Sequence, residues 1–310
     1  MGRDDELVGV YDGVAVEDVL VGYGGYLSAS GLSASTVKSY VADLKDLGSW
    51  LREHDRGSPV AATENDLRAY CRYLVAAKDH PPATVNRRLQ AMRKFFRYAL
   101  DRGLTQEDPS SGIKLLPQSR TDGRRALEPS EIEGLLEAIR QRGSRLAQRD
   151  YAIIQLMLQT GIRVGELTRL RLPDVRLSAQ KGSLIVRAEG TSGEREIPLN
   201  SSVRKAIHSY LSERPRGKED HLFLSVKGEP LSARSVQRLV NTYAEVAGLS
   251  DVSTYALRHT FGQQLLRDTG DLSVVARLMG HKRLESAIKY VVPGQEDLTE
   301  VAEKSSLNVY

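Results

Sequence analysis

The sequence contains little cysteine, few aromatic residues and no long apolar run. Its single cysteine, Cys71, excludes an internal disulfide, and its setting in LRAYCRYL predicts a buried, small apolar side chain. We therefore expect a reducing, cytoplasmic environment. No run of about 18 apolar residues is present, so we expect no membrane-spanning segment. The first residues contain early acids and no apolar stretch, which is not typical of a secretory signal.

Net charge is small, but the basic residues are clustered. The formal charge is +4, from 44 basic against 40 acidic residues. Between Pro81 and Arg97 there are five basic residues and no acid. A solvated helix face would explain this stretch, and so would a helix that lies on DNA, with its cations on phosphates and Asn86 or Gln90 near base edges. The basic residues concerned are Arg87, Arg88, Arg93, Lys94 and Arg97.

The length of 310 residues is sufficient for two domains. Four amphipathic segments predict a helical bundle over residues 16–107, after a tail at 1–15. Prolines, glycines, serines and bases at 108–125 indicate an extended linker. Helical patterns and two β-branched segments, starting at Leu184 and Arg195, predict a second domain at 126–293, followed by a tail at 294–310. The expected fold is mainly α with a small β-sheet in the second domain.

Residues with chemical potential gather in the stretch from Thr254 to Tyr290. It contains Arg258, then His281 directly after a glycine, and then Tyr290. Helical spacing of the apolar residues predicts two helices interrupted by glycine, which can bring such residues onto one surface. Taken singly, His281 could cap a helix end and Tyr290 could be a core aromatic.

A second motif, TGIRVGEL, covers Thr160 to Leu167 and places Arg163 at a helix break. Arg163 alone could simply pair with Glu166 or Asp174. This motif, together with YALRH, MGH and Tyr290 in that order, resembles the signature of the tyrosine recombinase (phage integrase) family. The order of segments from Val16 to Tyr290 resembles the family's plan, a DNA clamp made of a core-binding (SAM-like) helical domain and a catalytic domain.

This resemblance implies an enzyme that cleaves and rejoins DNA through a 3'-phosphotyrosine intermediate. Tyr290 would be the nucleophile, and Arg163 and Arg258 would hold the non-bridging oxygens on which charge builds in the transition state. His281 would donate a further hydrogen bond. Such a reaction needs no metal and no cofactor. Glu166 and Asp174 would orient Arg163.

Two positions depart from the family pattern. Tyr255 stands where the family usually has histidine, and tyrosine is a poor general base because its unperturbed pKa is about 10. Alignment of GEREIPL without gaps puts Gly190 where the family has the lysine that serves as general acid. General-acid assistance would then come from another residue, or cleavage would be slow or depend on assembly. The candidate replacement acids are Lys181, Arg187 and Lys227.

The resemblance is compatible with an integrase, a transposon-type recombinase or a Xer-like resolvase. It implies double-stranded DNA as partner, a homotetramer in the synaptic complex and a tail that docks on a neighbouring protomer. A type IB topoisomerase would share the tyrosine chemistry but act as a monomer without a site. A DNA-binding accessory protein with weakened catalysis is a third alternative. The sequence does not specify the target site.

Overall fold

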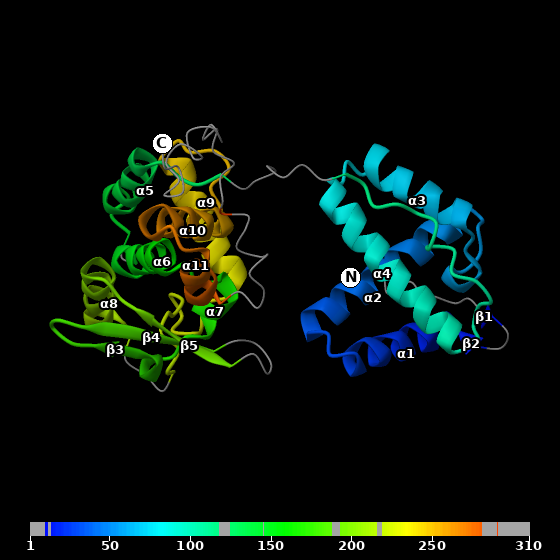
Figure 1. Ribbon diagram of the computed structural model, residues 1–310, viewed down its shortest axis with the longest axis horizontal. Coiled ribbons are helices and arrows are strands. Elements are labelled where there is room, and N and C mark those ends of the chain that lie inside the picture. Colours follow the sequence, from blue (N-terminus) through cyan, green and yellow to red (C-terminus); the bar gives the residue numbers. More distant parts are fainter. Residues whose placement is uncertain are drawn as a thin grey trace, which may run out of the picture. The chain divides into compact units, whose positions relative to one another are not determined.

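The structure is a computed structural model that describes residues 10–11, 14–117, 125–144, 146–187, 193–215, 219–280 and 290. The chain separates into two compact units, Met1–Arg120 and Thr121–Tyr310 (Figure 1). Each unit has its own apolar core. No helix in these described ranges is long and apolar enough to cross a bilayer.

The first unit contains the four predicted helices. They are α1 (Val16–Ala29), α2 (Ala34–Glu53), α3 (Glu64–Ala76) and α4 (Pro82–Asp101), with a short 3-10 helix at Pro59–Ala61. Two of these helices begin at side-chain caps: the side chain of Ser33 accepts from the amide of Thr36, and that of Thr63 accepts from the amide of Asp66. A short antiparallel pair, β1 (Val10–Tyr11) with β2 (Val14–Ala15), lies in the region that we expected to be a tail.

The core of the first unit forms where the four apolar stripes meet. Leu44 and Leu47 of α2, Tyr23 of α1 and Phe95 and Phe96 of α4 are completely buried. The rings of Tyr23 and Phe95 meet edge to face at 5.4 Å. These contacts join α1 and α2 to α4, so the basic helix has a fixed position in the bundle.

The first half of the predicted linker packs on this bundle. Ser110 is fully buried, and Ile113 belongs to the apolar core of the unit. Its main-chain oxygen accepts a hydrogen bond of 2.6 Å from Arg93, and that of Gly112 accepts one of 3.0 Å from Arg68. Residues 108–117 therefore belong to the first unit, whereas residues 118–124 lie outside the described part of the chain.

The second unit surrounds one buried helix. It comprises α5 (Pro129–Gln141), α6 (Ala147–Thr160), α7 (Val164–Arg169), a 3-10 turn (Leu172–Asp174), α8 (Ser201–Glu213), α9 (Ala233–Val246), α10 (Thr254–Thr269) and α11 (Leu272–Met279). Helix α6 is buried on nearly every side and packs against α5, α8 and α10 (Figure 1). Such a pattern is typical of a central core helix. This helix connects the sheet side of the unit to α10, which carries Arg258.

A small antiparallel sheet completes the second unit. Its order is β3 (Val175–Leu177), β4 (Gly182–Arg187) and β5 (Glu194–Pro198), with Val186 opposite Arg195. The sequence predicted β4 and β5 but not β3. The apolar residues after His221 form isolated bridges, such as that of Leu224 with Pro230, and are not part of this sheet.

Candidate active site

A glycine fixes the break between α6 and α7. Gly161 ends α6 in the left-handed conformation (φ 58°), and α7 begins at Val164 with Arg163 as the residue before its first turn. A β-carbon at Gly161 would lie 2.4 Å from a ring carbon of Phe261 on α10. The close approach of these two segments requires glycine here, and it brings Arg163 toward α10.

Glu166 holds Arg163 from one turn further along α7. Its carboxylate accepts hydrogen bonds from the Arg163 amide at 2.9 Å and from the guanidinium at 3.0 Å. The remaining bond of Arg163 goes to the main-chain oxygen of Gly280 at 3.1 Å. The Arg163 side chain is 45% exposed, so these bonds hold the guanidinium in place while part of it stays accessible.

The carboxylate of Glu166 is also bound by Arg195 of β5. Two guanidinium nitrogens of Arg195 reach its two oxygens at 2.9 and 2.8 Å. Burial raises the pKa of Glu166, but hydrogen bonds from Arg195 and from the Arg163 amide outweigh that effect and lower its pKa to about 2. Glu166 is therefore ionised throughout the physiological range.

Arg258 is the buried cation of the site, with 5% of its surface exposed. Its guanidinium donates to the main-chain oxygens of Gly161 and, at 2.7 Å, Met279. Burial lowers the pKa of Arg258 to about 10, and the nearby charge of Arg163 adds to this shift. The guanidinium remains charged at pH 7.

Tyr290 packs onto the same face of α10. It is 1% exposed and forms an apolar cluster with Val275, Ala276 and Met279. A β-carbon at Gly262 would lie 2.6 Å from two carbons of its ring, so the glycine makes room for the tyrosine. Tyr290 is also close enough to Arg258 to oppose the lowering of the arginine's pKa. The structure thus brings together Arg163, Arg258 and Tyr290, whereas His281 lies outside the described residues.

Tyr255 lies one turn before Arg258 on α10. Its ring is stacked on that of His259, with centroids 6.2 Å apart and planes at 13°. The His259 ring in turn lies 5.2 Å from that of Tyr290. A continuous row of three rings therefore runs from the first turn of α10 to Tyr290, and Tyr255 belongs to the surroundings of the site.

The three candidate replacement acids lie in different places. Arg187 ends β4 and pairs with the buried Asp174. The expectation that Asp174 orients Arg163 is therefore wrong, because its carboxylate is engaged by Arg187. Lys181 precedes the opposite end of β4, about 20 Å along the strand from Arg187 at 3.3 Å per residue. Lys227 is exposed in the turn between Ser225 and Glu229. Gly190 lies outside the described residues.

Four of the α4 residues expected on DNA are engaged within the first unit. The side-chain amide of Asn86 exchanges two hydrogen bonds of 2.8 Å with the main chain of Leu116. Arg87 pairs with the buried Asp43, and Arg88, 13% exposed, binds Asp46 at 2.8 Å. Arg93 donates to the main-chain oxygen of Ile113. The Asn86 amide differs most from expectation, because the segment at 113–116 already occupies its donor and acceptor.

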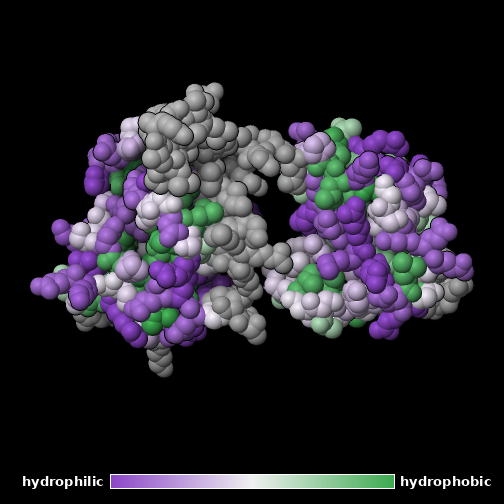
Figure 2. Space-filling model, in the orientation of Figure 1, coloured by the Kyte–Doolittle hydropathy of each residue, from purple (hydrophilic) through white to green (hydrophobic). Residues whose placement is uncertain are grey.

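The remaining α4 cations point outward. Lys94 and Arg97 are exposed, and Arg97 makes a long 3.7 Å contact with Asp101. Gln90 is half-buried. Figure 2 shows hydrophilic residues gathered along α4 on the visible face of the first unit. This face retains the charge expected for phosphate contacts, although fewer side chains are available than the sequence suggested.

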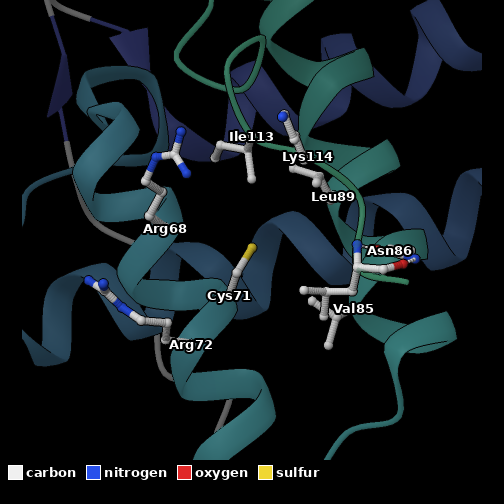
Figure 3. A pocket seen from close by; sticks show the side chains of 9 residues that line it. Arg68, Cys71, Arg72, Val85, Asn86, Leu89, Ile113 and Lys114 are labelled. Atoms are coloured by element: carbon white, nitrogen blue, oxygen red, sulfur yellow. Dashed lines mark hydrogen bonds between the residues drawn. The ribbon is translucent and has the colours of Figure 1, made fainter. Parts of the chain in front are cut away.

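A pocket of about 200 Å³ lies in the first unit between α3, α4 and residues 113–116. Figure 3 shows Cys71 with Arg68 and Arg72 on one side of it and Lys114, Asn86 and Val85 across the pocket on the other. Cys71 is half-buried, less enclosed than predicted, and burial raises the pKa of its thiol. The thiol is therefore protonated at neutral pH.

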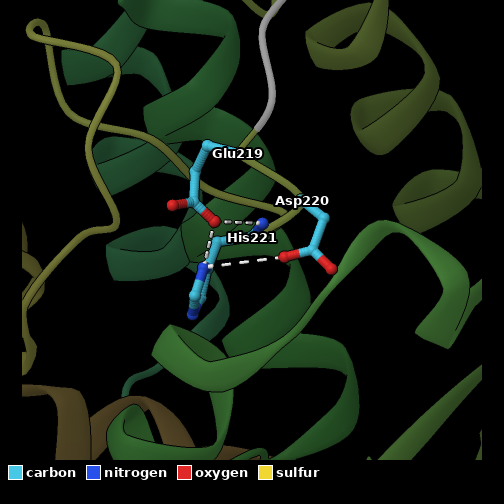
Figure 4. Close-up of side chains that lie close together, drawn as sticks. All are labelled: Glu219, Asp220 and His221. Atoms are coloured by element: carbon cyan, nitrogen blue, oxygen red, sulfur yellow. Dashed lines mark hydrogen bonds and ion pairs between the residues drawn. The ribbon is translucent and has the colours of Figure 1, made fainter.

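Glu219, Asp220 and His221 form a group whose side chains are close enough to hold a metal ion (Figure 4). The ring of His221 contacts Glu219, while Asp220 pairs with Arg171 at 3.0 Å. The main-chain oxygen of Asp220 also accepts from Leu172 at 2.8 Å. These contacts explain the group as a junction between two loops.

Arg195 is a further residue of the site, and the motifs in the sequence did not point to it. Period-two alternation in β5 places it on the same face as Ile197, which is 2% exposed. A charged residue on the covered face of a strand needs a buried partner. The alternation in EREIP therefore predicts that Arg195 has a carboxylate partner, and in the structure this partner is Glu166.

Two guanidiniums beside one tyrosine define a class of site. Paired arginines bind phosphate oxygens, and a phenol can attack phosphorus. The second unit therefore has the composition of a phosphoryl-transfer enzyme that uses a tyrosine.

Comparison with known proteins identifies the family. Residues 125–296 match the model of the phage integrase family, and residues 20–103 match the phage integrase N-terminal SAM-like domain. The chain is 33% identical over 281 residues to tyrosine recombinase XerD of Caulobacter vibrioides, covering 87% of this chain and 89% of that protein. It is 32% identical over 267 residues to XerC of Roseiflexus castenholzii, covering 84% and 83%.

Solved structures agree on the fold. The Tn1549 transposon integrase in complex with a circular intermediate DNA matches with a TM-score of 0.72 and 20% identity, covering 92% of this chain and 98% of that one. A lambda integrase (75–356) dimer bound to a core site gives 0.69 and 19%, covering 87% and 96%. The chain belongs to the phage integrase family and is a site-specific tyrosine recombinase.

Proposed function

We propose that Tyr290 is the nucleophile of strand cleavage and that Arg163 and Arg258 bind the non-bridging oxygens of the phosphodiester. The observation that carries this proposal is the position of Tyr290, packed on the face of α10 beside Arg258. Arg163 supplies an exposed guanidinium next to the same helix end. His281 follows Gly280 in the sequence and donates a further hydrogen bond.

The reaction is an exchange of one ester for another. The phenol oxygen of Tyr290 bonds to phosphorus, the bond from phosphorus to the 5'-oxygen breaks, the phenol loses its proton and the 5'-oxygen gains one. Strand rejoining reverses these changes with a different 5'-hydroxyl. Because the phosphotyrosine bond keeps the ester linkage, the cycle consumes no cofactor. The two arginines stabilise the charge that develops on the non-bridging oxygens.

The enclosure of Tyr290 has a mechanical consequence. At 1% exposure, its side chain cannot touch a phosphate of duplex DNA from its present position. The side chain must therefore leave the Gly262 surface before attack. Cleavage that depends on assembly, which the missing lysine also suggested, is consistent with this arrangement.

A nicked suicide substrate tests the assignment of Tyr290. The wild-type protein forms a covalent adduct that migrates more slowly in denaturing electrophoresis, and Tyr290→Phe forms none. Tyr243→Phe is the matched control, because Tyr243 is a buried tyrosine of α9 that binds Asp150 at 2.9 Å, away from Arg258. An adduct from Tyr290→Phe at the wild-type level would refute the proposal. If the wild type itself forms no adduct, the result favours a DNA-binding accessory role instead.

The general acid remains to be assigned among Arg187, Lys181 and Lys227. Arg187 pairs with Asp174 at one end of β4, whereas Lys181 precedes the other end of that strand and Lys227 lies in an exposed turn. A substrate with a 5'-bridging phosphorothiolate separates them, because its sulfur leaves without an acid. The variant of the true acid loses activity on the normal substrate and regains it on the sulfur substrate. If no variant behaves so, none of the three is the acid.

We further propose that the chain acts as a homotetramer on two DNA duplexes, in the cytoplasm and on the nucleoid. Support comes from the lambda integrase dimer bound to a core site, in which a protein of similar fold assembles on DNA. Residues 294–310, outside the described part, would dock on a neighbouring protomer. Sedimentation of the protein on its site should show a tetramer for the full chain and smaller complexes after removal of 294–310. Relaxation of any plasmid by a monomer would instead favour topoisomerase action.

A further inference from the structure

Three arginines converge on the carboxyl end of α11. The main-chain oxygens of Leu278, Met279 and Gly280 each accept a hydrogen bond from a different guanidinium. Arg195 binds Leu278 at 3.0 Å, Arg258 binds Met279 at 2.7 Å, and Arg163 binds Gly280 at 3.1 Å. The last carbonyls of a helix have no partners inside the helix and carry the negative end of its dipole, so cations stabilise them.

Arg195 occupies a special place among the three. All three of its nitrogens are engaged, Nε with Leu278 and the two terminal nitrogens with Glu166. It therefore connects the strand β5, the carboxylate that holds Arg163 and the helix end that precedes His281. A planar guanidinium can make these three bonds at once, whereas the single ammonium of lysine cannot reproduce that geometry.

We propose that Arg195 is a positioning residue for strand cleavage, which fixes Arg163 through Glu166 and fixes the end of α11 through Leu278. This inference rests on the proposed roles of Arg163 and Tyr290. Arg195 does not need to contact DNA to act in this way, since its donors are already satisfied and 15% of its side chain is exposed.

The consequence of losing Arg195 follows from the charges around Glu166. The described neighbours that bind this carboxylate are Arg195 and Arg163. Without Arg195, both carboxylate oxygens turn to Arg163, and the guanidinium is drawn from Gly280 toward Glu166. The donors that should face the phosphate then point elsewhere, and the helix end loses two of its three arginine contacts.

Arg195→Lys and Arg195→Gln test this inference in single-turnover cleavage of the suicide substrate. Arg214→Lys is the matched control. Arg214 also holds main-chain oxygens, with its Nε on Leu222 at 3.1 Å and a terminal nitrogen on Glu219 at 2.8 Å, and among the described residues it does not bind Arg163, Glu166 or the end of α11. DNA affinity and thermal unfolding are measured for each variant, so that lost folding is seen separately.

We expect the rate constant of cleavage to fall about 100-fold in both Arg195 variants, as displacement of a positioning group does, with DNA affinity within twofold of wild type. The fraction of protein that finally reacts stays unchanged, and the 5'-phosphorothiolate substrate restores nothing, because the acid is intact. Arg214→Lys keeps the wild-type rate constant.

A smaller reacting fraction with a wild-type rate constant would overturn the inference, because Arg195 would then act only on folding. Recovery on the sulfur substrate would overturn it in favour of an acid role. A fall of less than about tenfold in both variants would also overturn it. If the wild type forms no Tyr290 adduct, the proposed function fails first, and this outcome is distinguishable from all three.

Discussion

At the scale of single residues, the site is a balance of three guanidiniums and one carboxylate. Arg163, Arg195 and Arg258 lie around Glu166, which receives hydrogen bonds from the first two. The excess of positive charge is what an incoming phosphate requires, and burial of Arg258 prevents water from screening it. Glu166 limits the repulsion among the cations until the phosphate arrives.

Glu166→Gln should lower the free energy of unfolding by about 3 kcal/mol at pH 7, since the pKa of Glu166 falls from 4.5 to about 2 on folding. A lowered pKa gives stability above the unfolded value, which is lost as pH falls toward the folded value. The difference between wild type and variant should therefore shrink from pH 4.5 to pH 2. Chemical denaturation at pH 7 and pH 3 measures it, and a difference independent of pH would contradict the assignment.

Arg258→Lys should convert a pH-independent cation into a pH-dependent one. Burial and Arg163 lower the pKa of the arginine to about 10, and the same causes act on a lysine from a lower starting value. The lysine is charged only below its pKa, so cleavage by the variant should fall as pH rises from 7 to 9. It should be about 100-fold slow at pH 7. A single-turnover pH profile as flat as that of wild type would be the contrary result.

At the scale of elements, the carboxyl end of α11 determines how the site is assembled. Gly280 closes this helix with φ 64°, and a β-carbon there would lie 2.7 Å from a terminal nitrogen of Arg195. The glycine is thus required twice, once by its conformation and once by the arginine beside it.

Gly280→Ala should therefore both destabilise the protein and slow cleavage. Gly270→Ala is its matched control, because Gly270 closes α10 at φ 63° and has no atom within 4 Å of the added carbon. Both variants should lose about 1 kcal/mol from the left-handed conformation. Only Gly280→Ala should lose more and also reduce the rate constant of cleavage. Equal rates in the two variants would show that the contact with Arg195 does not matter.

The elements also show what local sequence can and cannot predict. Caps such as Ser33 and Thr63, and helix-ending glycines such as Gly161 and Gly280, depend on residues next to them in the chain, so they are visible in local sequence. Residues 113–116 were expected to be extended linker, because their packing depends on partners far away along the chain, such as Asn86. Strand β3 was missed since three residues are too few to show alternation.

The site residues also divide into those that sequence motifs predict and those whose contacts depend on the fold. Motif order brought out Arg163, Arg258 and Tyr290, and the structure places these three together in one unit. The partner of Arg187 was not predictable, because Asp174 meets it only once the sheet has formed. Arg195 could have been inferred from its strand face, but its contact with Leu278 spans 83 residues and needs the fold.

At the scale of the whole molecule, we propose that both units bind DNA and that the second unit cleaves it. The second unit holds the arginines and Tyr290, and the first presents the α4 face with Lys94 and Arg97. A cation on a phosphate adds affinity without regard to sequence, because every nucleotide has the same phosphate.

Lys94→Ala/Arg97→Ala should weaken binding to specific and nonspecific duplexes alike. If each residue contacts one phosphate, the slope of log affinity against log salt should become less steep by about 1.8. Arg140→Ala/Lys205→Ala removes the same charge from exposed positions on α5 and α8 and is the control. Fluorescence anisotropy across a salt series measures the slopes, and equal slopes for the two double variants would place the α4 face away from DNA.

The central claim is that the oxygen of Tyr290 becomes bonded to the 3'-phosphate of a cleaved strand. Mass spectrometry of the proteolysed adduct from a suicide substrate tests it most directly. The account predicts one modified peptide, with the nucleotide attached at Tyr290 through its 3'-phosphate. Attachment at Tyr255 or any other residue, or through a 5'-phosphate, would contradict it.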